Sequence, residues 1–453
     1  MKSGTWLFLA LAAFPAGAQV PATPAPSPLS SPPAAPTAPA APVSLSLTAA
    51  LQRALAQNFA IGRSRAEVAA QEAQTRVIVS SILPKIGFQS NYTLNNKEVS
   101  FGSSNGQSVV ILPRNDWSYR FTLSQPIWAG NRERKAIQQA RLQVDLAREG
   151  LLDAEDQLLL GVAGDYLTVL SAEQLIAVEQ QNLQLSQRRR SQAQVFFEAG
   201  ETTRVDVLRA DADIKVVERR LAAARQQREA AVGRLRLDLA LEAPIAVEPP
   251  GPFLPKLPAE TELAATAEAS RPAVIEAKNQ LTVAQLEVEK QRNALLPTVT
   301  ADGAWINQRS AFPASQYGQF SLHLNVPIFD SGEIKGRVAV AREREHQAEL
   351  ALAQVRQQVR EEVHQALVDL TTAEASLQLA KEQQTAAEAE YAQASELYRA
   401  QELTSLETQT AETSLAEARR TVATSQLDRD VAELRVWAAA GLLKKTVPLE
   451  GAQ

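Results

Sequence analysis

The side chains that could perform catalytic or metal chemistry in this chain are few and scattered. Its three histidines, His323, His346 and His364, are not spaced as metal ligands, and Glu361 and Glu362 point to different faces of a predicted helix. The chain has no cysteine, which excludes a disulfide framework and a thiolate metal site. A glycine-rich phosphate loop is also missing. We therefore predict no catalytic, cofactor-binding or metal-binding residues, and no enzymatic activity.

The sequence contains an internal repeat, so the predicted helices and strands occur twice along the chain. Residues 82–88 (ILPKIGF) return as 295–301 (LLPTVTA), and 125–130 (QPIWAG) return as 326–331 (VPIFDS). The first pair is offset by 213 residues (84 to 297) and the second by 201 (126 to 327), so the loop between them is 12 residues longer in the first copy. Beyond this point the offset of 201 holds. Each copy is predicted to contain a helix, a strand pair and a long helical stretch, and such a unit closes a core only by assembly through repetition.

The N-terminus reads as an export signal. Lys2 precedes an apolar run from Trp6 to Phe14, and Ala16-Gly17-Ala18 supplies small residues for cleavage, which predicts a signal peptide over 1–18. Residues 19–43 are rich in Pro, Ala, Ser and Thr and are predicted to form an extended tether without a known role. No later stretch approaches the roughly 20 apolar residues of a spanning helix. The exported chain is then either soluble in the periplasm or a β-barrel.

Charge excludes one class of partner. The formal net charge is -5, with acids and bases interspersed, which argues against a nucleic-acid surface. The run Arg188-Arg189-Arg190 is interpreted as an exposed helix face and not as a binding patch.

Prolines mark the boundaries of the predicted helices. None lies between Pro126 and Pro244 or between Pro327 and Pro448, so both stretches are predicted to be mostly helical. Apolar residues spaced by seven within them indicate coiled-coil packing, and in the first stretch they are Val162, Val169, Ile176 and Leu183. A helix from Gly130 to Glu198 would be roughly 100 Å long at about 1.5 Å per residue. The predicted divisions are a first repeat at 44–243, a connector at 244–258, a second repeat at 259–443 and a tail at 444–453.

Apolar and polar residues alternate in four short segments between the helices, near 86–94, 117–123, 299–305 and 320–326. A period of two with one apolar, aromatic face fits lipid-facing strands about 10 residues long. One such strand alone would fit a half-buried soluble sheet equally well. The side chains predicted to face lipid are Phe88, Tyr92, Tyr119, Phe121, Trp305, Leu322 and Leu324.

Four strands cannot close a barrel, and open edges in a bilayer leave backbone groups unsatisfied. Several chains must therefore share one barrel. A dimer would give eight strands and a filled interior, whereas a trimer would give twelve strands and room for a lumen. The residues by themselves do not decide between twelve and sixteen strands.

Over about Ser44 to Gly441, the chain resembles the TolC family of outer-membrane efflux ducts. The resemblance rests on the duplicated Leu-Pro and Pro-Ile motifs above, on Ala54-Leu55-Ala56-Gln57-Asn58 and on the predicted hairpin tip at 199–208 (AGETTRVDVL). It implies a mainly α protein with membrane β structure: long helical hairpins form a periplasmic α-barrel, and four strands per chain contribute to a trimeric 12-stranded transmembrane β-barrel. It also implies shorter equatorial elements, a location in the outer membrane extending into the periplasm, and partners in a periplasmic adaptor (membrane fusion protein) and an inner-membrane pump.

The resemblance also assigns residues at the closed periplasmic end. Asp206 and Glu407 match acidic aperture positions in the two repeats, and Tyr398 matches a linking tyrosine. The tips expected to contact the adaptor are Ala199, Gly200, Glu201, Ala400, Gln401 and Glu402. Three positions depart from the family pattern, because Gln401 replaces a glycine, Leu403 a basic residue and Thr410 an acid. The bonding pattern of the gate therefore cannot be transferred intact.

Two functions of different classes follow. The first is the exit duct of a tripartite efflux or type I secretion system. The second is a periplasmic coiled-coil adaptor or scaffold that never enters a membrane. The amphipathic strand pairs favour the duct, and an adaptor is expected to carry one hairpin instead of two. The exported substrate and the class of pump are not encoded in any recognisable motif, because a wide tunnel needs little specific contact with its cargo.

Overall fold

The computed structural model describes residues 43–102, 108–249, 255–310 and 314–446. All of them belong to one compact unit, Pro42–Gln453. The predicted signal peptide, nearly all of the predicted tether and residues 447–453 of the predicted tail lie outside the described residues. Among the described helices, none combines the length and apolar composition needed to cross a membrane.

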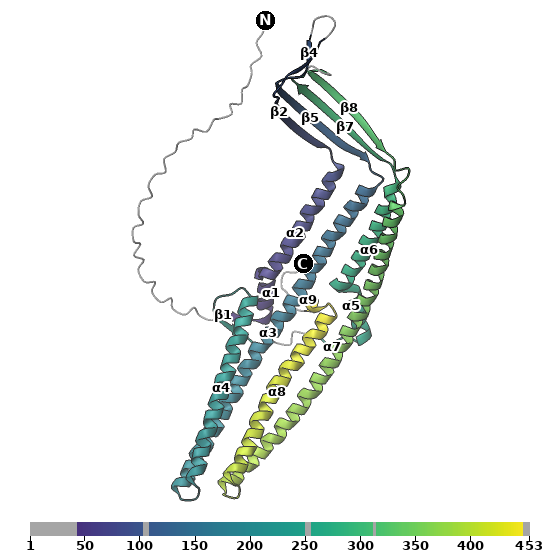
Figure 1. Ribbon diagram of the computed structural model, residues 1–453. Helices are drawn as coiled ribbons and strands as arrows, with labels where there is room; N and C mark the ends of the chain where they lie inside the picture. Colours follow the sequence, from purple (N-terminus) through teal and green to yellow (C-terminus); the bar gives the residue numbers. More distant parts are fainter. Residues whose placement is uncertain (1–42, 103–107, 250–254, 311–313, 447–453) are drawn as a thin grey trace, which may run out of the picture. The chain divides into compact units, whose positions relative to one another are not determined.

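The two repeats form the same helices with the same lengths (Figure 1). The pairs are α1 (Leu47–Gln57) and α5 (Glu260–Ser270) with 11 residues, α2 (Phe59–Val79) and α6 (Pro272–Arg292) with 21, α3 (Arg132–Glu198) and α7 (Glu333–Arg399) with 67, and α4 (Arg204–Asp238) and α8 (Ser405–Ala439) with 35. One-turn 3₁₀ helices follow α2 at Ser80–Ile82 and α6 at Asn293–Leu295, and α9 (Leu443–Thr446) follows α8. Both proline-free stretches are helical, as their composition predicts.

The long helices pack as two hairpins that lie against each other. Helix α3 packs on α4 and helix α7 on α8, while α3 and α8 join the two hairpins. Figure 1 shows the resulting order α4, α3, α8, α7, which leaves α4 and α7 at opposite edges. Towards the strands, α2 and α6 pack beside α3 and α7 in place of α4 and α8.

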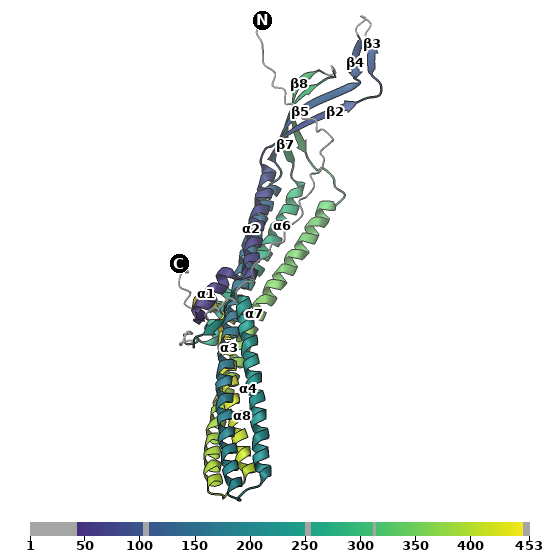
Figure 2. The ribbon, with the colours of Figure 1, turned by 90° about the vertical axis from the view of Figure 1, so that its left-hand side faces the viewer.

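A four-stranded antiparallel sheet lies at the ends of α2, α3, α6 and α7 (Figures 1 and 2). Its order is β2 (Lys85–Leu94), β5 (Asn115–Trp128), β7 (Thr298–Gln308) and β8 (Gln316–Asn325). The longer loop of the first repeat carries a small hairpin, β3 (Val99–Gly102) with β4 (Ser108–Leu112). This hairpin accounts for much of the length difference between the two copies.

Each segment with a Pro-Ile motif leads from a strand into a tight turn, and a long helix follows that turn. Gly130 and Asn131 have positive φ angles of 62° and 61° before α3, and Ser331 and Gly332 have 54° and 87° before α7. A Cβ atom on Gly130 would lie 2.8 Å from the Cβ of Leu296. The end of the first strand pair therefore packs directly on the Leu-Pro start of the second, which requires a glycine there.

The largest apolar core surrounds the middle of α3. Helix α1, the parallel strand pair β1 (Val43–Leu45) and β6 (Ile245–Val247), and α9 gather there. Tyr166 on α3 is fully buried, and its hydroxyl donates to the carbonyl oxygen of Leu45 at 2.8 Å. The segment predicted as a connector at 244–258 thus contributes a strand that pairs with the start of the first repeat beside the long helix.

Candidate functional site

The predicted tip residues lie in the two turns that join the long helices. Helix α3 ends with Ala199 as its C-cap, and α7 ends with Ala400 in the same role. The next residue adopts a left-handed conformation in both turns, with φ of 78° at Gly200 and 63° at Gln401. This is the usual end of a helix, but only glycine adopts it without a steric cost. The second tip therefore holds a non-glycine residue in a glycine conformation.

Both predicted aperture acids cap the helix that follows their turn. The Asp206 carboxylate accepts hydrogen bonds from the backbone N–H of Thr203 at 3.3 Å and from the Thr202 hydroxyl at 2.6 Å. The Glu407 carboxylate accepts from the backbone N–H of Thr404 at 3.0 Å, and the Thr404 hydroxyl accepts from the backbone N–H of Glu407 at 3.3 Å. These are capping boxes, and the Thr-x-x-Asp and Thr-x-x-Glu spacing in the sequence is a signal for them.

The hydrogen bonds keep both acids ionised. The Thr202 hydroxyl holds the pKa of Asp206 below its usual value, against the opposing effect of burial. The Thr404 hydroxyl does the same for the pKa of Glu407. An acid at these positions thus has a local structural reason that does not depend on any ring of charges.

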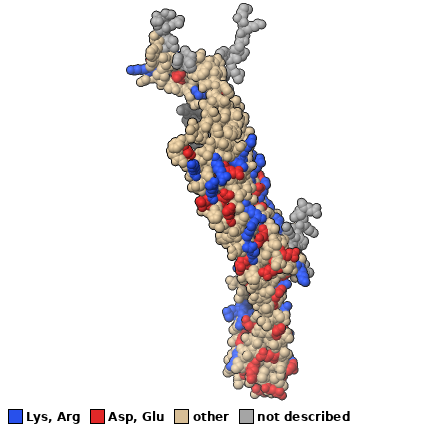
Figure 3. Space-filling view, turned by 90° about the vertical axis from the view of Figure 1, so that its right-hand side faces the viewer, with Lys and Arg blue, Asp and Glu red and all other residues tan. Residues whose placement is uncertain are grey.

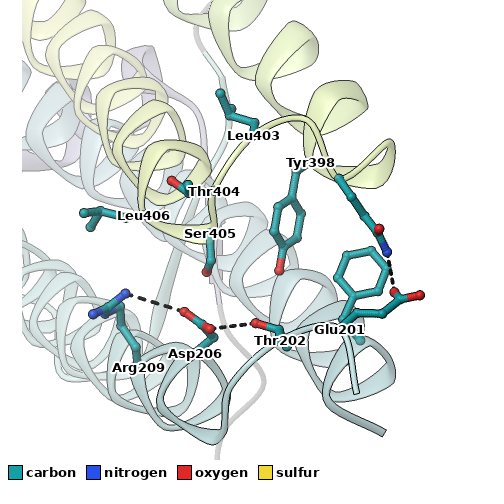
Figure 4. Close-up of a pocket in the computed structure, with 11 residues that line it drawn as sticks. Glu201, Thr202, Asp206, Arg209, Tyr398, Leu403, Thr404, Ser405 and Leu406 are labelled. Atoms are coloured by element: carbon teal, nitrogen blue, oxygen red, sulfur yellow. Dashed lines mark hydrogen bonds and ion pairs between the residues drawn. The ribbon is translucent and has the colours of Figure 1, made fainter. Parts of the chain in front are cut away.

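A cleft of about 460 Å³ lies between the two tips (Figure 4). Tyr398 and Asp206 both line it, together with Arg209, whose guanidinium lies 3.6 Å from the Asp206 carboxylate. Tyr398 is buried and packs edge-on against Phe196 with ring centroids 5.5 Å apart. Burial raises the pKa of Tyr398 above its usual value, so the hydroxyl stays neutral.

The structure brings together some of the predicted aperture residues and not others. Asp206 and Tyr398 share the cleft, whereas Glu407 is exposed and does not line it. Of the departures from the family pattern, Leu403 lines the cleft and Thr410 donates to the carbonyl oxygen of Leu406 at 3.0 Å within α8. Their grouping around an aperture needs further chains and stays a prediction.

One contact links the two tips directly. The side-chain amide of Gln401 donates to the carboxylate of Glu201 (Figure 4). These two residues occupy adjacent and not equivalent positions in the two repeats, because Glu201 aligns with Glu402 and Gln401 with Gly200. The residue that departs from the glycine of the family therefore makes an interaction that glycine could not make.

Sequence reasoning missed a buried ionic network between the hairpins. Arg189 on α3, whose side chain is 6% exposed, pairs with Asp213 on α4 and with Glu412 on α8 at 3.1 Å. A second pair joins the 2% exposed Glu179 on α3 to Arg420 on α8 at 3.0 Å. Our interpretation of the whole run at 188–190 as an exposed face was therefore wrong for Arg189. Charged residues recurring at coiled-coil spacing on α3 were the available signal.

The network also changes the expected coiled-coil seam. Val162 and Val169 are fully buried as expected, but Ile176 and Leu183, seven and fourteen residues further on, are only partly buried. The buried positions there are Glu179, Asn182, Ser186 and Arg189. Polar residues of α8 face this part of α3, so ion pairs and hydrogen bonds replace the apolar seam.

The seven side chains predicted to face lipid share one face of the sheet. The strand register places Phe88 opposite Phe121, Phe121 opposite Trp305 and Leu322 opposite Ala301. Because strand residues alternate between faces, Tyr92, Tyr119 and Leu324 lie on that same face. All seven are exposed in the single chain, from 38% for Trp305 to 70% for Tyr92. The opposite face carries the polar members of the alternation, such as Thr122 and Asn325.

The strand end of the surface in Figure 3 is largely uncharged, whereas acidic and basic side chains cover the helices. Among the described residues, no group of three or more His, Cys, Asp or Glu side chains is placed to hold a metal ion. The features that stand out are therefore an exposed apolar sheet face at one end of the helices and two capped, cleft-forming tips at the other.

Comparison with known proteins gives one consistent family. The sequence model of the outer membrane efflux protein family matches residues 50–240 and 263–442. The chain is 25% identical over 340 residues to outer membrane efflux protein BepC of Brucella suis biovar 1 (strain 1330), covering 74% of this chain and 72% of the relative. It is 25% identical over 347 residues to protein CyaE of Bordetella pertussis (strain Tohama I), covering 73% and 70%.

Solved structures share the fold. CusC superposes with a TM-score of 0.76 at 19% identity, covering 87% of this chain and 91% of that chain. The MtrE outer membrane channel of Neisseria gonorrhoeae, in its open state, superposes with a TM-score of 0.74 at 20% identity, covering 88% and 89%. At these identities the likeness concerns the arrangement of helices and strands.

Proposed function

The chain belongs to the outer membrane efflux protein family, and we propose that it is the passive exit duct of a tripartite efflux or type I secretion system. The observation that carries this proposal is the sheet at the end of the long helices. One of its faces is apolar and exposed in the single chain, and the other is polar. Such a sheet suits lipid on one side and a water-filled lumen on the other.

We propose that three chains complete the duct. Strands β2 and β8 end the sheet, and neither has a further strand partner among the described residues. An open edge cannot remain in a bilayer, because its backbone groups would lack hydrogen-bond partners. Three copies supply twelve strands and a lumen, and helices α4 and α7 at the two edges would continue the same closure below the membrane.

We further propose that the two tips meet a periplasmic adaptor, which connects the duct to an inner-membrane pump. The tips lie at the end of the helices that is remote from the sheet, and the turns at Ala199–Glu201 and Ala400–Glu402 are exposed.

The test is the assembly state in isolated outer membranes. We expect a band of oligomeric mass in unheated samples that converts to monomer on heating, because closed membrane barrels resist detergent until they are heated. The band should fractionate with the outer membrane. A monomer confined to the soluble periplasmic fraction would overturn the duct and favour the scaffold alternative.

A further inference from the structure

The internal repeat relates the contact between the two hairpins of one chain to a contact between chains. Helices α3 and α7 are repeat partners, and so are α4 and α8, at the constant offset of 201 residues (172 to 373). The observed contact of α3 with α8 therefore has an equivalent, which is α7 with α4. Within one chain α7 and α4 stand at opposite edges (Figure 1), so this equivalent contact requires a second copy.

The observed contact shows which residues face each other across such a seam. Around one small pocket, Ser186 and Arg189 of α3 face Glu412 and Ala416 of α8. The ion pair of Arg189 with Glu412 crosses this seam and is almost completely shielded from solvent. The cation lies on the first helix of one hairpin and the anion on the second helix of the other hairpin.

At the equivalent positions the charges differ. Arg189 corresponds to Glu390 on α7 (189 to 390), Glu412 to Asp211 on α4 (412 to 211), and the small Ala416 to Lys215 (416 to 215). Glu390 and Asp211 would repel each other if they met alone. Lys215, one helical turn from Asp211, supplies a positive charge where the observed seam has only a methyl group.

A second cation stands beside Asp211 already. The Arg190 guanidinium lies 3.0 Å from the Asp211 carboxylate, and both side chains remain substantially exposed in the single chain. Lys215 is 75% exposed and pairs with Glu218 on the same helix at 2.8 Å. Glu390 is exposed and has no hydrogen bond or ion pair within the described part of the chain. Once α7 of one copy meets α4 of the next, Glu390 would lie beside two bases, Lys215 and Arg190, whose present partners are exposed acids on α4.

The wider charge pattern of the two edges agrees with this arrangement. From Glu382 to Glu396, every charged residue of α7 is an exposed acid. Figure 3, viewed from the side of α7, shows acidic side chains concentrated at the tip end. On α4 the exposed charged side chains are mostly basic, and they are Arg204, Arg209, Lys215, Glu218, Arg219, Arg225, Glu229 and Arg234.

We propose that neighbouring copies of this chain meet along α7 and α4, and that Glu390 of one copy pairs with Lys215 and Arg190 of the next. This inference rests on the proposed oligomeric duct and adds the seam and its residues. The seam within a chain is closed by a buried ion pair, whereas the seam between chains is closed by a larger and more hydrated cluster. Salt screens hydrated pairs more strongly, so the seam between chains is the one that ionic strength weakens.

The chain is free of cysteine, so introduced pairs can be cross-linked without background. The test variant is the full chain with Glu390→Cys and Lys215→Cys, treated in outer membranes with a short bismaleimide. We expect a ladder of covalent oligomers on a denaturing gel. The matched control is Ser186→Cys with Ala416→Cys, two residues that line the observed pocket. It should link within one chain and leave the band at monomer mass.

The possible outcomes distinguish a failure of the proposed contact between chains from a failure of the proposed duct. Oligomers on a native gel without covalent oligomers from the test pair would overturn the seam and leave the duct intact. The absence of any oligomer in the unmodified chain would overturn both.

Charge exchange gives an independent measurement if a cysteine variant assembles poorly. Lys215→Glu should lower the temperature at which the oligomer band converts to monomer, and adding Glu390→Lys should restore that temperature. A double variant no more stable than Lys215→Glu alone would contradict the pairing.

Discussion

At the residue scale, each acid at the tips has two possible roles, which are to cap a helix and to act on passing ions. Asp206 and Glu407 each close a capping box, which explains why an acid follows each turn. The same carboxylates are kept ionised by their hydrogen bonds, so they can also act on passing ions if several copies meet. Substitutions by the corresponding amides separate the roles, because an amide oxygen can still accept the capping hydrogen bond.

We expect Asp206→Asn with Glu407→Gln to reduce the cation selectivity of the channel and its dependence on salt, because clustered carboxylates concentrate cations at a narrow aperture. Single-channel recording in planar bilayers, with the unmodified protein alongside, measures both. Thr203→Ala and Thr404→Ala serve as controls, since they weaken the caps by about 1 kcal/mol and leave the charges in place. Unchanged selectivity in the amide variant would assign the two acids a capping role only.

Gln401 has an unfavourable backbone conformation and a favourable side-chain hydrogen bond. Its left-handed conformation costs about 1 kcal/mol relative to glycine, and its amide bridges to Glu201. We expect Gln401→Ala to reduce hydrogen-exchange protection of the tip amides, because it loses the bridge and keeps the strain. Gln401→Gly should be less harmful by about 1 kcal/mol, because it loses both. Equal protection in the two variants would show that the backbone strain has no energetic weight.

At the element scale, the register of the strands decides which side chains share a face. Each strand by itself has one apolar side, but only the pairing decides whether these sides coincide, and the observed register places the apolar sets of all four strands together. A slip by one residue would move one of these sets to the polar side. The aromatic contact between Phe121 and Trp305, with centroids 5.9 Å apart, joins the two repeats on this face.

We expect Phe121→Arg or Leu322→Arg to block assembly into the outer membrane, because an arginine facing lipid near the middle of the bilayer costs about 2 to 4 kcal/mol in every chain. Thr122→Arg and Asn325→Arg, on the other face of the same strands, should be tolerated. The yield of heat-modifiable oligomer measures the difference. Equal yields on the two faces would mean that the apolar face does not meet lipid.

At the scale of the whole molecule, an apolar core joins the two hairpins near the middle of α3, whereas buried charges join them towards the tips. Arg189 contacts acids from both α4 and α8, so one side chain connects three helices. Burial raises the pKa of Glu412, while the Arg189 guanidinium and the Ser186 hydroxyl oppose that shift. Such a network requires all its members, since a buried charge left alone is costly.

We expect Arg189→Met to lower the free energy of unfolding of the tip half by about 3 to 5 kcal/mol, because it leaves Glu412 and Asp213 without their cation. Arg188→Met, next to it on the exposed side of α3, should change the stability by less than about 0.5 kcal/mol. Protease cleavage within α3 and α8 of the assembled protein measures both. A similar rate for the two variants would mean that the network does not hold the hairpins together.

Much of the fold follows from the sequence by itself. Prolines and the internal repeat predict which stretches are helical and where they turn, because proline is excluded from helix interiors whatever the tertiary context. Alternating residues predict the four strands and their apolar sides for the same local reason. The tip assignments came with the resemblance to a family, and the domain boundaries, the aperture and the adaptor contacts stay predictions.

Only the tertiary structure decided which residues lie between the hairpins. Periodicity favoured Ile176 and Leu183 for the seam and placed Arg189 outside, yet Arg189 is buried. A seven-residue repeat gives a helix face, but the partner helix determines whether that face is apolar or charged. Here α8 presents Glu412 and Arg420 to α3, and a buried charge becomes favourable only beside an opposite charge from a segment more than 200 residues away.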